Sequence, residues 1–600
     1  MSGPRPSRPA AAGERLVVTG LPMAPGLAAG MAVFHTEHEV DVPVRALAEA
    51  DVPAEQERLR LALDDARARL RELEGRIRSQ VGAHDARIFS MQGLLLDDES
   101  FRDGLRGRIR QHLVNAEVAV RDEVSEWERR LAAASQGTDR DPGADLRDIG
   151  RLLLRVLAGR RHEVNLGDGD DQVVLVTREL LPSDAARVDR ARLVAIVTGS
   201  GGVASHAAIL ARGLGIPAVT GVDVAALPAR GGRWIVDGGA GTVTLNPSPA
   251  DVEAASRRSA DYRRFRQELL AQAAGFASTA DGVAIELLLN VENFQELPAE
   301  LLPDLRGIGL YRTEFLFMGR EWLPSEEEQY EHYVGALKKV GQREITFRTI
   351  DVGGDKPLRC LSVPSEPNPV LGWRGLRLSL EWPDLFYTQV RALLRASAHG
   401  RMRVMFPMVT MIEEFRRARE IVAEVRDDLR RRGVAHDPDL QLGAMIEVPA
   451  AALACGTLAE EADFLSIGTN DLSQYALAVD RNNARVAALY QPLHPGLLAI
   501  VRLVVQTADA AGTPVSLCGE MAGDPQATLL LLGLGLRSFS MSPYHLPVVK
   551  KVIAAVDLDH ARAVAREVFA LGSTTEVRAL LRGETLRLVP DLAKWLSEGR

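Results

Sequence analysis

The stretch FLSIGTND, residues 464–471, sets a pattern that recurs through the second half of the chain. Its apolar residues predict a short buried strand, and the polar residues Asn470 and Asp471 follow at the end of that strand. The stretch GAMIE, residues 443–447, repeats the pattern and ends in Glu447. Parallel strands that run into polar side chains are typical of α/β folds that hold a site at the carboxyl ends of their strands.

Eight strands are predicted between residues 276 and 600, separated by helical patterns, and all but the fourth, which ends in Pro407 and Met408, run into polar residues. They are residues 285–289, 307–310, 345–347, 403–406, 443–446, 464–467, 514–517 and 538–540. Eight alternating strands and helices in about 290 residues predict a TIM (β/α)8 barrel. Polar residues at the strand ends are therefore candidate site residues, namely Asn290, Arg312, Arg348, Glu447, Asn470, Asp471, Cys518, Glu520 and Ser542.

Residues 43–161 carry apolar stripes at helical spacing. The clearest stripe comprises Leu59, Leu63, Ala66, Leu70, Leu73 and Ile77. Its steps of four and three residues predict one apolar face on a long helix. Further stripes within residues 120–131 and 146–156 predict a helical bundle. The heptad-like spacing also fits an intermolecular coiled coil, but short repeats separated by turns favour the bundle.

A smaller α/β domain flanks the bundle in the sequence. Residues 15–42 and 162–249 are expected to form it together, with strands at residues 173–176, 193–197, 234–236 and 243–245. Residues 250–275 are highly charged and helix-forming, which predicts a linker helix. Residues 1–14 lack the apolar segment of a signal peptide and predict a disordered tail. The expected fold class is multidomain α/β, with a small swivelling domain, an inserted helical bundle and a C-terminal barrel at residues 276–600.

Composition excludes several classes of protein. The net charge is −9 and no basic stripe with interleaved aromatic residues is present, which argues against a nucleic-acid partner. Cys360, Cys455 and Cys518 are far apart, so neither a zinc knuckle nor a disulfide framework is expected. No apolar run is long enough to insert into a membrane. A reducing cytoplasm fits these observations best.

His206 lies in the stretch GGVASHAAILAR, residues 201–212. Two glycines bring the chain to the start of a predicted helix, and the histidine falls in its first turn. The free N–H groups and positive dipole end of a helix N-terminus suit a phosphate. A histidine there can accept a phosphoryl group, although a lone histidine is more often a surface or packing residue.

Arg312 and Arg348 follow adjacent predicted strands, so both should point into one mouth of the barrel. Guanidinium groups match the oxygens of phosphate and carboxylate, and two of them at one mouth indicate a phosphate dianion. The alternative is a salt bridge to Glu314 or Asp351. Two further arginines, Arg374 and Arg481, add weaker candidates.

Glu447 and Asp471 end neighbouring strands, and two carboxylates near a phosphate indicate a divalent cation such as Mg²⁺. The alternative is that arginines satisfy both carboxylates. Asn470 is placed to contact a phosphate. Cys518 also ends a strand, where a thiol of tunable pKa can act as an acid or base, although free cysteines are usually inert core residues.

Together these residues show a family resemblance. The chain resembles enzyme I of the bacterial phosphoenolpyruvate-dependent phosphotransferase system from about residue 16 to about residue 570. The stretches that carry the resemblance are GLYRTEFLF (309–317), RTIDVGGDK (348–356), NPVLGWR (368–374) and SIGTNDLSQY (466–475). Such long and specific motifs rule out chance similarity.

The resemblance implies a reaction and a set of roles. The barrel would dimerise and bind phosphoenolpyruvate and Mg²⁺. His206 would take the phosphoryl group and pass it to a histidine of the phosphocarrier protein HPr, docked on the helical bundle. The residues implied are Arg312, Arg348, Arg481, Asn470, Lys356 and Arg374 for phosphoenolpyruvate, Glu447 and Asp471 for Mg²⁺, and Cys518 for protonating enolpyruvate at carbon.

The sequence departs from the family beside the histidine. Ala204 stands where the family usually has Thr, Ser or Asn, and Val203 replaces a frequent arginine. A hydrogen bond that positions the imidazole or its phosphate is therefore missing, and Ser205 is the nearest candidate to compensate. The change bears on the rate of transfer or on the lifetime of the phosphohistidine.

Two alternative functions remain at this stage. A paralogue that feeds a regulatory, nitrogen-type carrier shares the same motifs, and Ala204 leaves that assignment open. Dikinases and synthases that act on pyruvate or phosphoenolpyruvate also pair a phosphohistidine domain with a barrel. They need a nucleotide-binding module of several hundred residues, for which the region before the α/β domain offers little room.

Overall fold

The computed structural model of the chain consists of two compact units, residues 1–265 with 593–600, and residues 266–592. The structure describes residues 15–24, 26–35, 42–80, 92–93, 95–134, 144–159, 171–178, 180, 192–199, 211, 216–227, 232–272, 275–294, 297, 305–317, 322–353, 366, 368–481, 483, 486 and 489–593. Among the helices it describes, none combines the length and hydropathy needed to cross a membrane.

An eight-stranded sheet in the first unit draws its strands from two separated parts of the sequence. The strands lie in the order β1-β8-β7-β3-β4-β5-β6-β2. The parallel pairing of β3 with β4 joins the two parts of the sequence. The strands are β1 (Leu16–Thr19), β2 (Leu21–Ala24), β3 (Leu27–His35), β4 (Val173–Thr177), β5 (Leu193–Thr198), β6 (Ala218–Thr220), β7 (Arg233–Asp237) and β8 (Thr242–Leu245). The strand β6 was not predicted, because three residues are too few to show a period.

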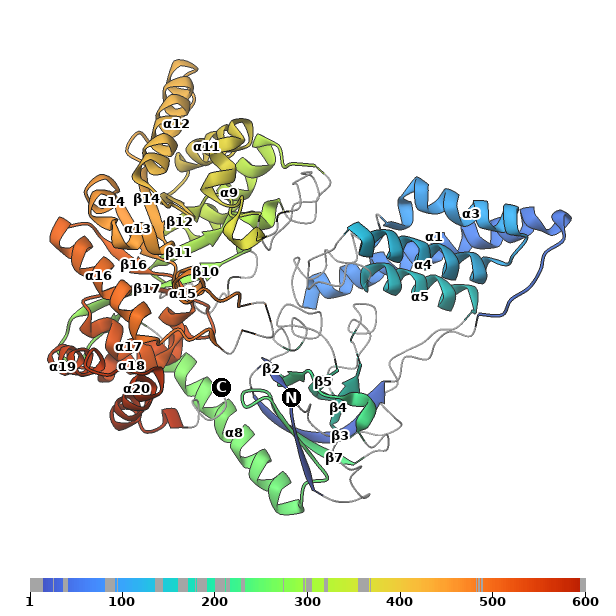
Figure 1. Ribbon diagram of the computed structural model, residues 1–600, viewed down its shortest axis with the longest axis horizontal. Coiled ribbons are helices and arrows are strands. Elements are labelled where there is room, and N and C mark those ends of the chain that lie inside the picture. The colour runs from blue at the N-terminus through green and yellow to red at the C-terminus, as the bar shows by residue number, and fades with distance from the viewer. Residues whose placement is uncertain are drawn as a thin grey trace, which may run out of the picture. The chain divides into compact units, whose positions relative to one another are not determined.

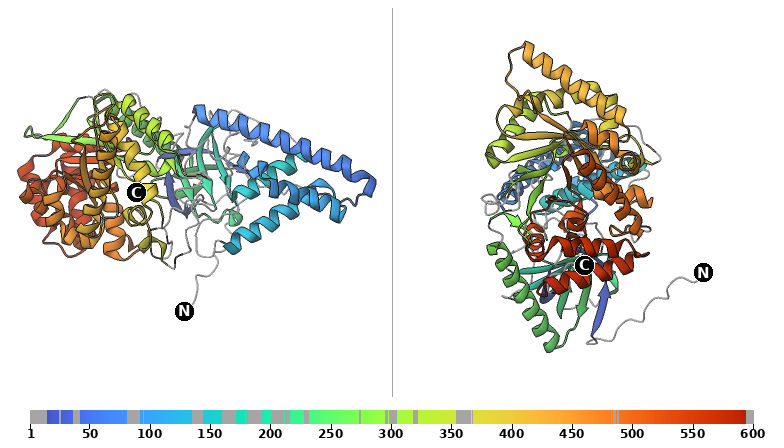
Figure 2. Two further views of the ribbon diagram at one scale, coloured as in Figure 1. Left: turned by 90° about the horizontal axis from the view of Figure 1, so that it is seen from above. Right: turned by 90° about the vertical axis from the view of Figure 1, so that its left-hand side faces the viewer.

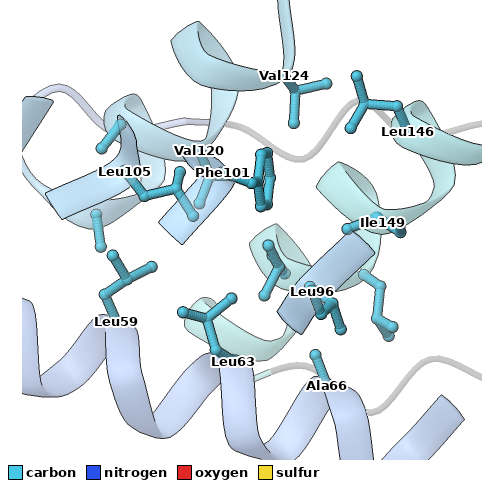
Figure 3. Close-up of a cluster of buried hydrophobic side chains, with 14 of the residues drawn as sticks. Leu59, Leu63, Ala66, Leu96, Phe101, Leu105, Val120, Val124, Leu146 and Ile149 are labelled. Atoms are coloured by element: carbon cyan, nitrogen blue, oxygen red, sulfur yellow. The ribbon is translucent and has the colours of Figure 1, made fainter. Parts of the chain in front are cut away.

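Between β3 and β4 the chain forms a helical bundle (Figure 1). Its helices are α1 (Val52–Gln80), α3 (Glu99–His112), α4 (Ala116–Ala134) and α5 (Ala144–Leu157), and α1 runs the length of the bundle (Figure 2). Side chains from all of them, including Leu63, Phe101, Val120 and Ile149, share one buried core (Figure 3). The part of the predicted apolar stripe at Leu59, Leu63, Ala66 and Leu70 is thus covered by helices of the same chain, which favours the bundle.

A single long helix, α8 (Pro249–Gln272), follows the sheet, as the charged segment 250–275 predicts. Short 3-10 helices also occur in this half of the chain, η1 (Glu49–Asp51) and η2 (Val224–Ala226). The predicted tail, residues 1–14, lies outside the described residues.

The second unit is a closed barrel of eight parallel strands, which confirms the predicted fold class. The strands pair in the order β11-β12-β13-β14-β15-β16-β17-β10, and β10 closes on β11. They are β10 (Ala284–Val291), β11 (Gly307–Arg312), β12 (Glu344–Arg348), β13 (Met402–Phe406), β14 (Gln441–Ile446), β15 (Phe464–Ile467), β16 (Val515–Leu517) and β17 (Ser538–Met541), with β9 (Ala277–Ser278) antiparallel to β10. All eight strands were predicted from their apolar runs.

Helices surround these strands (Figure 1). They are α9 (Glu326–Val340), α10 (Leu376–Glu381), α11 (Pro383–Ser397), α12 (Ile412–Arg431), α13 (Pro449–Leu453), α14 (Cys455–Glu461), α15 (Thr469–Leu477), α16 (Pro495–Ala511), α17 (Pro525–Gly533), α18 (Leu546–Ala555), α19 (Leu558–Val568) and α20 (Thr574–Leu588). Short 3-10 helices η5 (Thr313–Leu316), η6 (Pro369–Leu371) and η8 (Glu520–Gly523) follow strand ends or lie in loops. The carboxyl ends of β10–β17 and the segments that follow them form the barrel mouth.

Candidate active site at the barrel mouth

The two arginines predicted to share the mouth are direct neighbours. Arg312 and Arg348 end β11 and β12 and are Cα partners in the parallel pairing of these strands. The side chain of Arg312 is one-third exposed and pairs with Glu292. That of Arg348 is almost completely buried. The mouth therefore offers one accessible and one buried guanidinium group from adjacent strands.

Arg348 is held by two carboxylates and still has an unused donor. One terminal nitrogen donates to Glu314, and the other lies 3.3 Å from Oδ2 of Asp351. Both alternatives from the sequence, a salt bridge to Glu314 or to Asp351, are therefore realised. The Nε–H of Arg348, however, is buried and has no hydrogen-bond partner among the described residues. A buried donor without a partner costs free energy unless a further acceptor satisfies it.

Arg374 reaches one of these carboxylates, that of Asp351, from a loop further along the chain. Gly353, with a φ of 96°, forms an isolated antiparallel bridge with Arg374, and a side chain at Gly353 would collide with the carbonyl oxygen of Trp373. The guanidinium of Arg374 then donates to both carboxylate oxygens of Asp351 at 2.9–3.2 Å. It also donates to Asp471 at 3.1 Å. Arg374 therefore ties the segment after β12 to the start of α15.

Glu447 and Asp471 lie on neighbouring strand ends, as predicted, because β14 pairs with β15. Glu447 is 1% exposed and accepts a hydrogen bond of 2.7 Å from the backbone N–H of Met408, which has a φ of 56°. Burial, and then the negative charges of Asp471 and Asp351, raise the pKa of Glu447 to about 8. The surroundings of Glu447 therefore disfavour its charged carboxylate form.

Among the buried groups of the mouth that the structure describes, carboxylates outnumber guanidinium groups. Four carboxylates near Arg348 are buried, those of Glu314, Asp351, Glu447 and Asp471. The buried guanidinium groups among these described residues are those of Arg348 and Arg374. Buried charges need partners, so this excess of carboxylates fits a cation.

A magnesium ion fits the donors that are present. Among the described residues, no group of three or more His, Cys, Asp or Glu side chains is arranged to hold a metal. Mg²⁺ usually takes one or two carboxylates and completes its shell with water and substrate oxygens. Glu447 and Asp471 would supply the carboxylates, and a cation there would offset the excess of buried carboxylates.

Cys518 directly follows β16 in the barrel and is 3% exposed. It belongs to a small apolar cluster with Leu310, Met405, Met445 and Phe464. Burial is the main cause that raises the pKa of the thiol, to about 11, and the nearby charge of Glu447 adds to it. The thiol therefore keeps its proton at neutral pH, which is the state required of a proton donor.

Asn470 and Arg481 lie at the edge of the mouth. The side-chain oxygen of Asn470 accepts a hydrogen bond of 2.8 Å from the backbone N–H of Glu520, and its nitrogen donates to the Glu520 side chain at 3.3 Å. The backbone N–H of Arg481 donates to Gln474 of α15 at 3.1 Å. Asn470 thus links the segments that follow β15 and β16.

Both family models and individual known proteins match this chain over most of its length. Family models match residues 19–138 (PEP-utilising enzyme, N-terminal), 169–241 (PEP-utilising enzyme, mobile domain) and 266–558 (PEP-utilising enzyme, PEP-binding domain). A phosphoenolpyruvate-protein phosphotransferase of Bacillus sp. (strain S) is 38% identical over 546 residues, which cover 90% of this chain and 94% of the relative. Proteins of the same name from Haemophilus influenzae and Staphylococcus carnosus are each 35% identical and cover 94% and 95% of this chain, and 98% and 99% of their own lengths.

This chain belongs to the phosphoenolpyruvate-protein phosphotransferase family. The resemblance inferred from the motifs is thereby confirmed, and so is the prediction of an enzyme. The barrel mouth described above lies within the residues that match the PEP-binding domain. His206 lies within those that match the mobile domain.

Part of the predicted site of this phosphotransferase lies outside the described residues. His206, with Ala204 and Ser205 beside it, falls in one such segment, and Lys356 falls in another. The structure brings together Arg312, Arg348, Arg374, Glu447, Asp471 and Cys518. The roles assigned to all these residues remain predictions.

Several residues at the barrel mouth of this phosphotransferase were not predicted as site residues. Asp351 is the most connected of them, because it faces both Arg348 and Arg374. Tyr475 of α15 donates to the carbonyl of Val370 at 2.6 Å and accepts from Arg374 at 3.3 Å. A carboxylate three residues after a strand-end arginine was a usable signal for Asp351. No local signal marks Tyr475, since its partners are about a hundred residues away.

Proposed function

We propose that the chain transfers the phosphoryl group of phosphoenolpyruvate to its own His206 and then to a histidine of HPr or an HPr-like carrier, the first step of sugar uptake by the phosphotransferase system. The observation that carries this proposal is the barrel mouth. It combines a buried arginine with an N–H that has no partner among the described residues, a second arginine that is accessible, and the two buried carboxylates of Glu447 and Asp471.

The mouth supports binding of the phosphate and carboxylate groups of phosphoenolpyruvate. Arg312 and Arg348 present guanidinium groups from adjacent strands, and such groups pair with phosphate oxygens through two parallel hydrogen bonds. Asn470, Arg481, Arg374 and Lys356 would complete this set. Arg374 contributes mainly by orienting Asp351 and Asp471, because its described donors are directed at these carboxylates.

Glu447 and Asp471 would hold Mg²⁺, which when bound neutralises charge on the transferring group. Phosphoryl transfer depends on positioning and charge neutralisation more than on covalent help from the protein. The arginines would hold the phosphate while the neutral imidazole of His206 approaches in line. The P–O bond of the substrate breaks as a P–N bond to His206 forms.

Cys518 would complete the reaction by protonating carbon. The departing group is the enolate of pyruvate, and its methylene carbon takes a proton to become the methyl group. The thiol of Cys518 keeps its proton well above neutral pH because burial raises its pKa to about 11. It can therefore donate that proton and regain one from water in the next cycle.

Other parts of the chain have proposed roles in the same cycle. The helical bundle would dock the carrier, and α8 would let the domain that bears His206 turn between the barrel and the carrier. The barrel domain would pair two chains in a homodimer. The enzyme would work in the cytoplasm.

A transfer assay tests this function. The chain is incubated with phosphoenolpyruvate labelled in its phosphate, with Mg²⁺, and with either a sugar-type or a nitrogen-type carrier. Acid-labile label should appear first on the chain and then on the sugar-type carrier. Transfer to the nitrogen-type carrier alone would favour the regulatory alternative. Label from ATP in the presence of pyruvate would instead indicate a dikinase or synthase.

A further inference from the structure

The end of β11 that carries Arg312 is irregular. Its register shifts against β12 between Ile308 and Tyr311, and it shifts against β10 at the same place. An extra residue in one strand of a sheet, a bulge, disrupts the ladder locally and redirects the side chains that follow. Gly309 lies in this bulge, where a β-carbon would come within 2.6 Å of Oγ of Ser540. Pairing resumes beyond the bulge at Tyr311 and Arg312, so the position of Arg312 depends on how this bulged segment is held.

Gln389 of α11 joins this bulged end to the end of β12. Its side-chain oxygen accepts a hydrogen bond of 2.9 Å from the backbone N–H of Ile350, two residues after Arg348. Its nitrogen donates to Oγ1 of Thr313, the residue after Arg312, at 3.0 Å. Thr313 in turn donates to the carbonyl of Arg348 at 2.8 Å. One planar amide thus fixes the separation of two strand ends.

The hydrogen-bond network of the Gln389 amide continues away from the mouth. The amide nitrogen lies 3.3 Å from the hydroxyl of Tyr333 in α9, which donates to Gln329 at 3.2 Å. Gln329 donates to the carbonyl of Pro324 at 3.1 Å. Gln389, Tyr333 and Gln329 are all fully buried, so an apolar replacement of any of them leaves polar atoms without partners.

We propose that Gln389 is a positioning residue that holds the bulged end of β11 against the end of β12 and so sets the spacing of Arg312 and Arg348 for a phosphate-bearing substrate. The identity of that substrate rests on the proposed function. The outer branch of hydrogen bonds, from the hydroxyl of Tyr333 through Gln329 to Pro324, leads away from the strand ends. The ring of Tyr333 packs against Phe347 of β12, and Tyr333→Phe keeps that ring.

Two pairs of variants separate positioning from stability. Gln389→Met removes both links to the strand ends, whereas Tyr333→Phe removes only the outer branch of the same network. Thr313→Val removes the hydroxyl between the strands, and Thr313→Ser restores a hydroxyl. Loss of correct spacing should raise KM for phosphoenolpyruvate about tenfold in Gln389→Met and Thr313→Val and leave kcat within about twofold.

The expected pattern is specific. Thr313→Ser and Tyr333→Phe should keep KM near that of the unaltered chain, although Tyr333→Phe lowers the melting temperature. The double variant Gln389→Met/Thr313→Val should raise KM by less than the product of the two single effects, because both substitutions break the Gln389–Thr313 link. Equal KM values in Gln389→Met and Tyr333→Phe would overturn the proposal.

A second measurement needs no substrate and decides the question even if Gln389→Met lowers overall stability. Hydrogen exchange at the amide of Ile350 should become faster in Gln389→Met and stay unchanged in Tyr333→Phe, after correction for the stability of each variant. The same exchange rate in both would contradict the proposal. Absence of turnover in the unaltered chain would instead count against the proposed function, and the exchange data would still judge the role of Gln389.

Discussion

Gly519 lies directly against Thr469. A β-carbon added at Gly519 would come 1.9 Å from Oγ1 and 2.6 Å from the backbone nitrogen of Thr469. Gly519 follows Cys518 at the end of β16, and Thr469 begins α15, whose first turn carries Asn470 and Asp471. The close approach of these two backbones sets how near the proposed proton donor lies to the proposed metal ligand and phosphate contact.

The substitution Gly519→Ala should therefore displace the start of α15. We expect a loss of about 1–3 kcal/mol in stability from overpacking and weaker stabilisation of the chain by phosphoenolpyruvate and Mg²⁺ in thermal unfolding. Gly583 in α20 serves as the control, since nothing lies within 4 Å of a β-carbon there. Gly583→Ala should leave stability unchanged or raise it. Equal behaviour of the two variants would refute the steric argument.

Arg348→Lys keeps the charge but removes the forked donors that serve Glu314, Asp351 and the proposed substrate. Because lysine cannot reproduce this geometry, labelling by phosphoenolpyruvate should slow about 10²–10³-fold, the usual effect of losing one oriented donor. Arg417→Lys at an exposed pair with Glu420 provides the control, and exposed pairs contribute little. A normal labelling rate in Arg348→Lys would remove this residue from the site.

Glu447→Gln should raise the Mg²⁺ concentration needed for labelling. The amide removes one of the two proposed carboxylate ligands and also lowers the excess of negative charge in the mouth. Titration of Mg²⁺ should give a half-saturating concentration at least about tenfold higher than in the unaltered chain, while the exposed substitution Glu420→Gln leaves the titration as it was. Coincident titration curves for all chains would exclude Glu447 as a ligand.

Cys518 gives a prediction for how the stability of the chain depends on pH. Since its folded-state pKa of about 11 lies above the ordinary value of 9.0, the proton favours the folded chain, and this contribution is lost as pH rises from about 9 toward about 11. Cys518→Ser should remove that part of the decline in stability.

The same thiol is predicted to set the fate of enolpyruvate. In Cys518→Ser the pyruvate formed from phosphoenolpyruvate labelled stereospecifically at its methylene carbon should lose its chirality at the methyl group, because water then protonates either face. Below about pH 9 the thiol keeps its proton, so its ionisation should not limit the rate at which the unaltered chain protonates enolpyruvate. Retained chirality in the variant would show that another group donates the proton.

The barrel and its two central arginines were predictable because each depends on a local pattern. Apolar runs mark the strands, and the residue after each run marks the mouth, so the pairing of Arg312 with Arg348 followed directly from their positions. The sequence left the alternatives for Arg348 open, and the structure shows why neither excludes the other. The guanidinium pairs with Glu314 and Asp351 and still leaves Nε without a described partner.

Contacts between distant loops were not predictable in this way. Arg374 meets Asp351 only because Gly353 adopts a positive φ and lets the two segments bridge. The bulge in β11 and its link to Gln389 depend on how α11 packs, which no local period encodes. Strand β6 was missed for a simpler reason, since its three residues show no alternation.

Transfer of the phosphoryl group to His206 is tested most directly by labelling the unaltered chain and His206→Ala with phosphoenolpyruvate labelled in its phosphate. The unaltered chain should carry acid-labile, base-stable label on the peptide that contains His206. His206→Ala should carry none, while phosphoenolpyruvate and Mg²⁺ still raise its melting temperature through the intact barrel. Label of unchanged stoichiometry on His206→Ala would contradict the assignment.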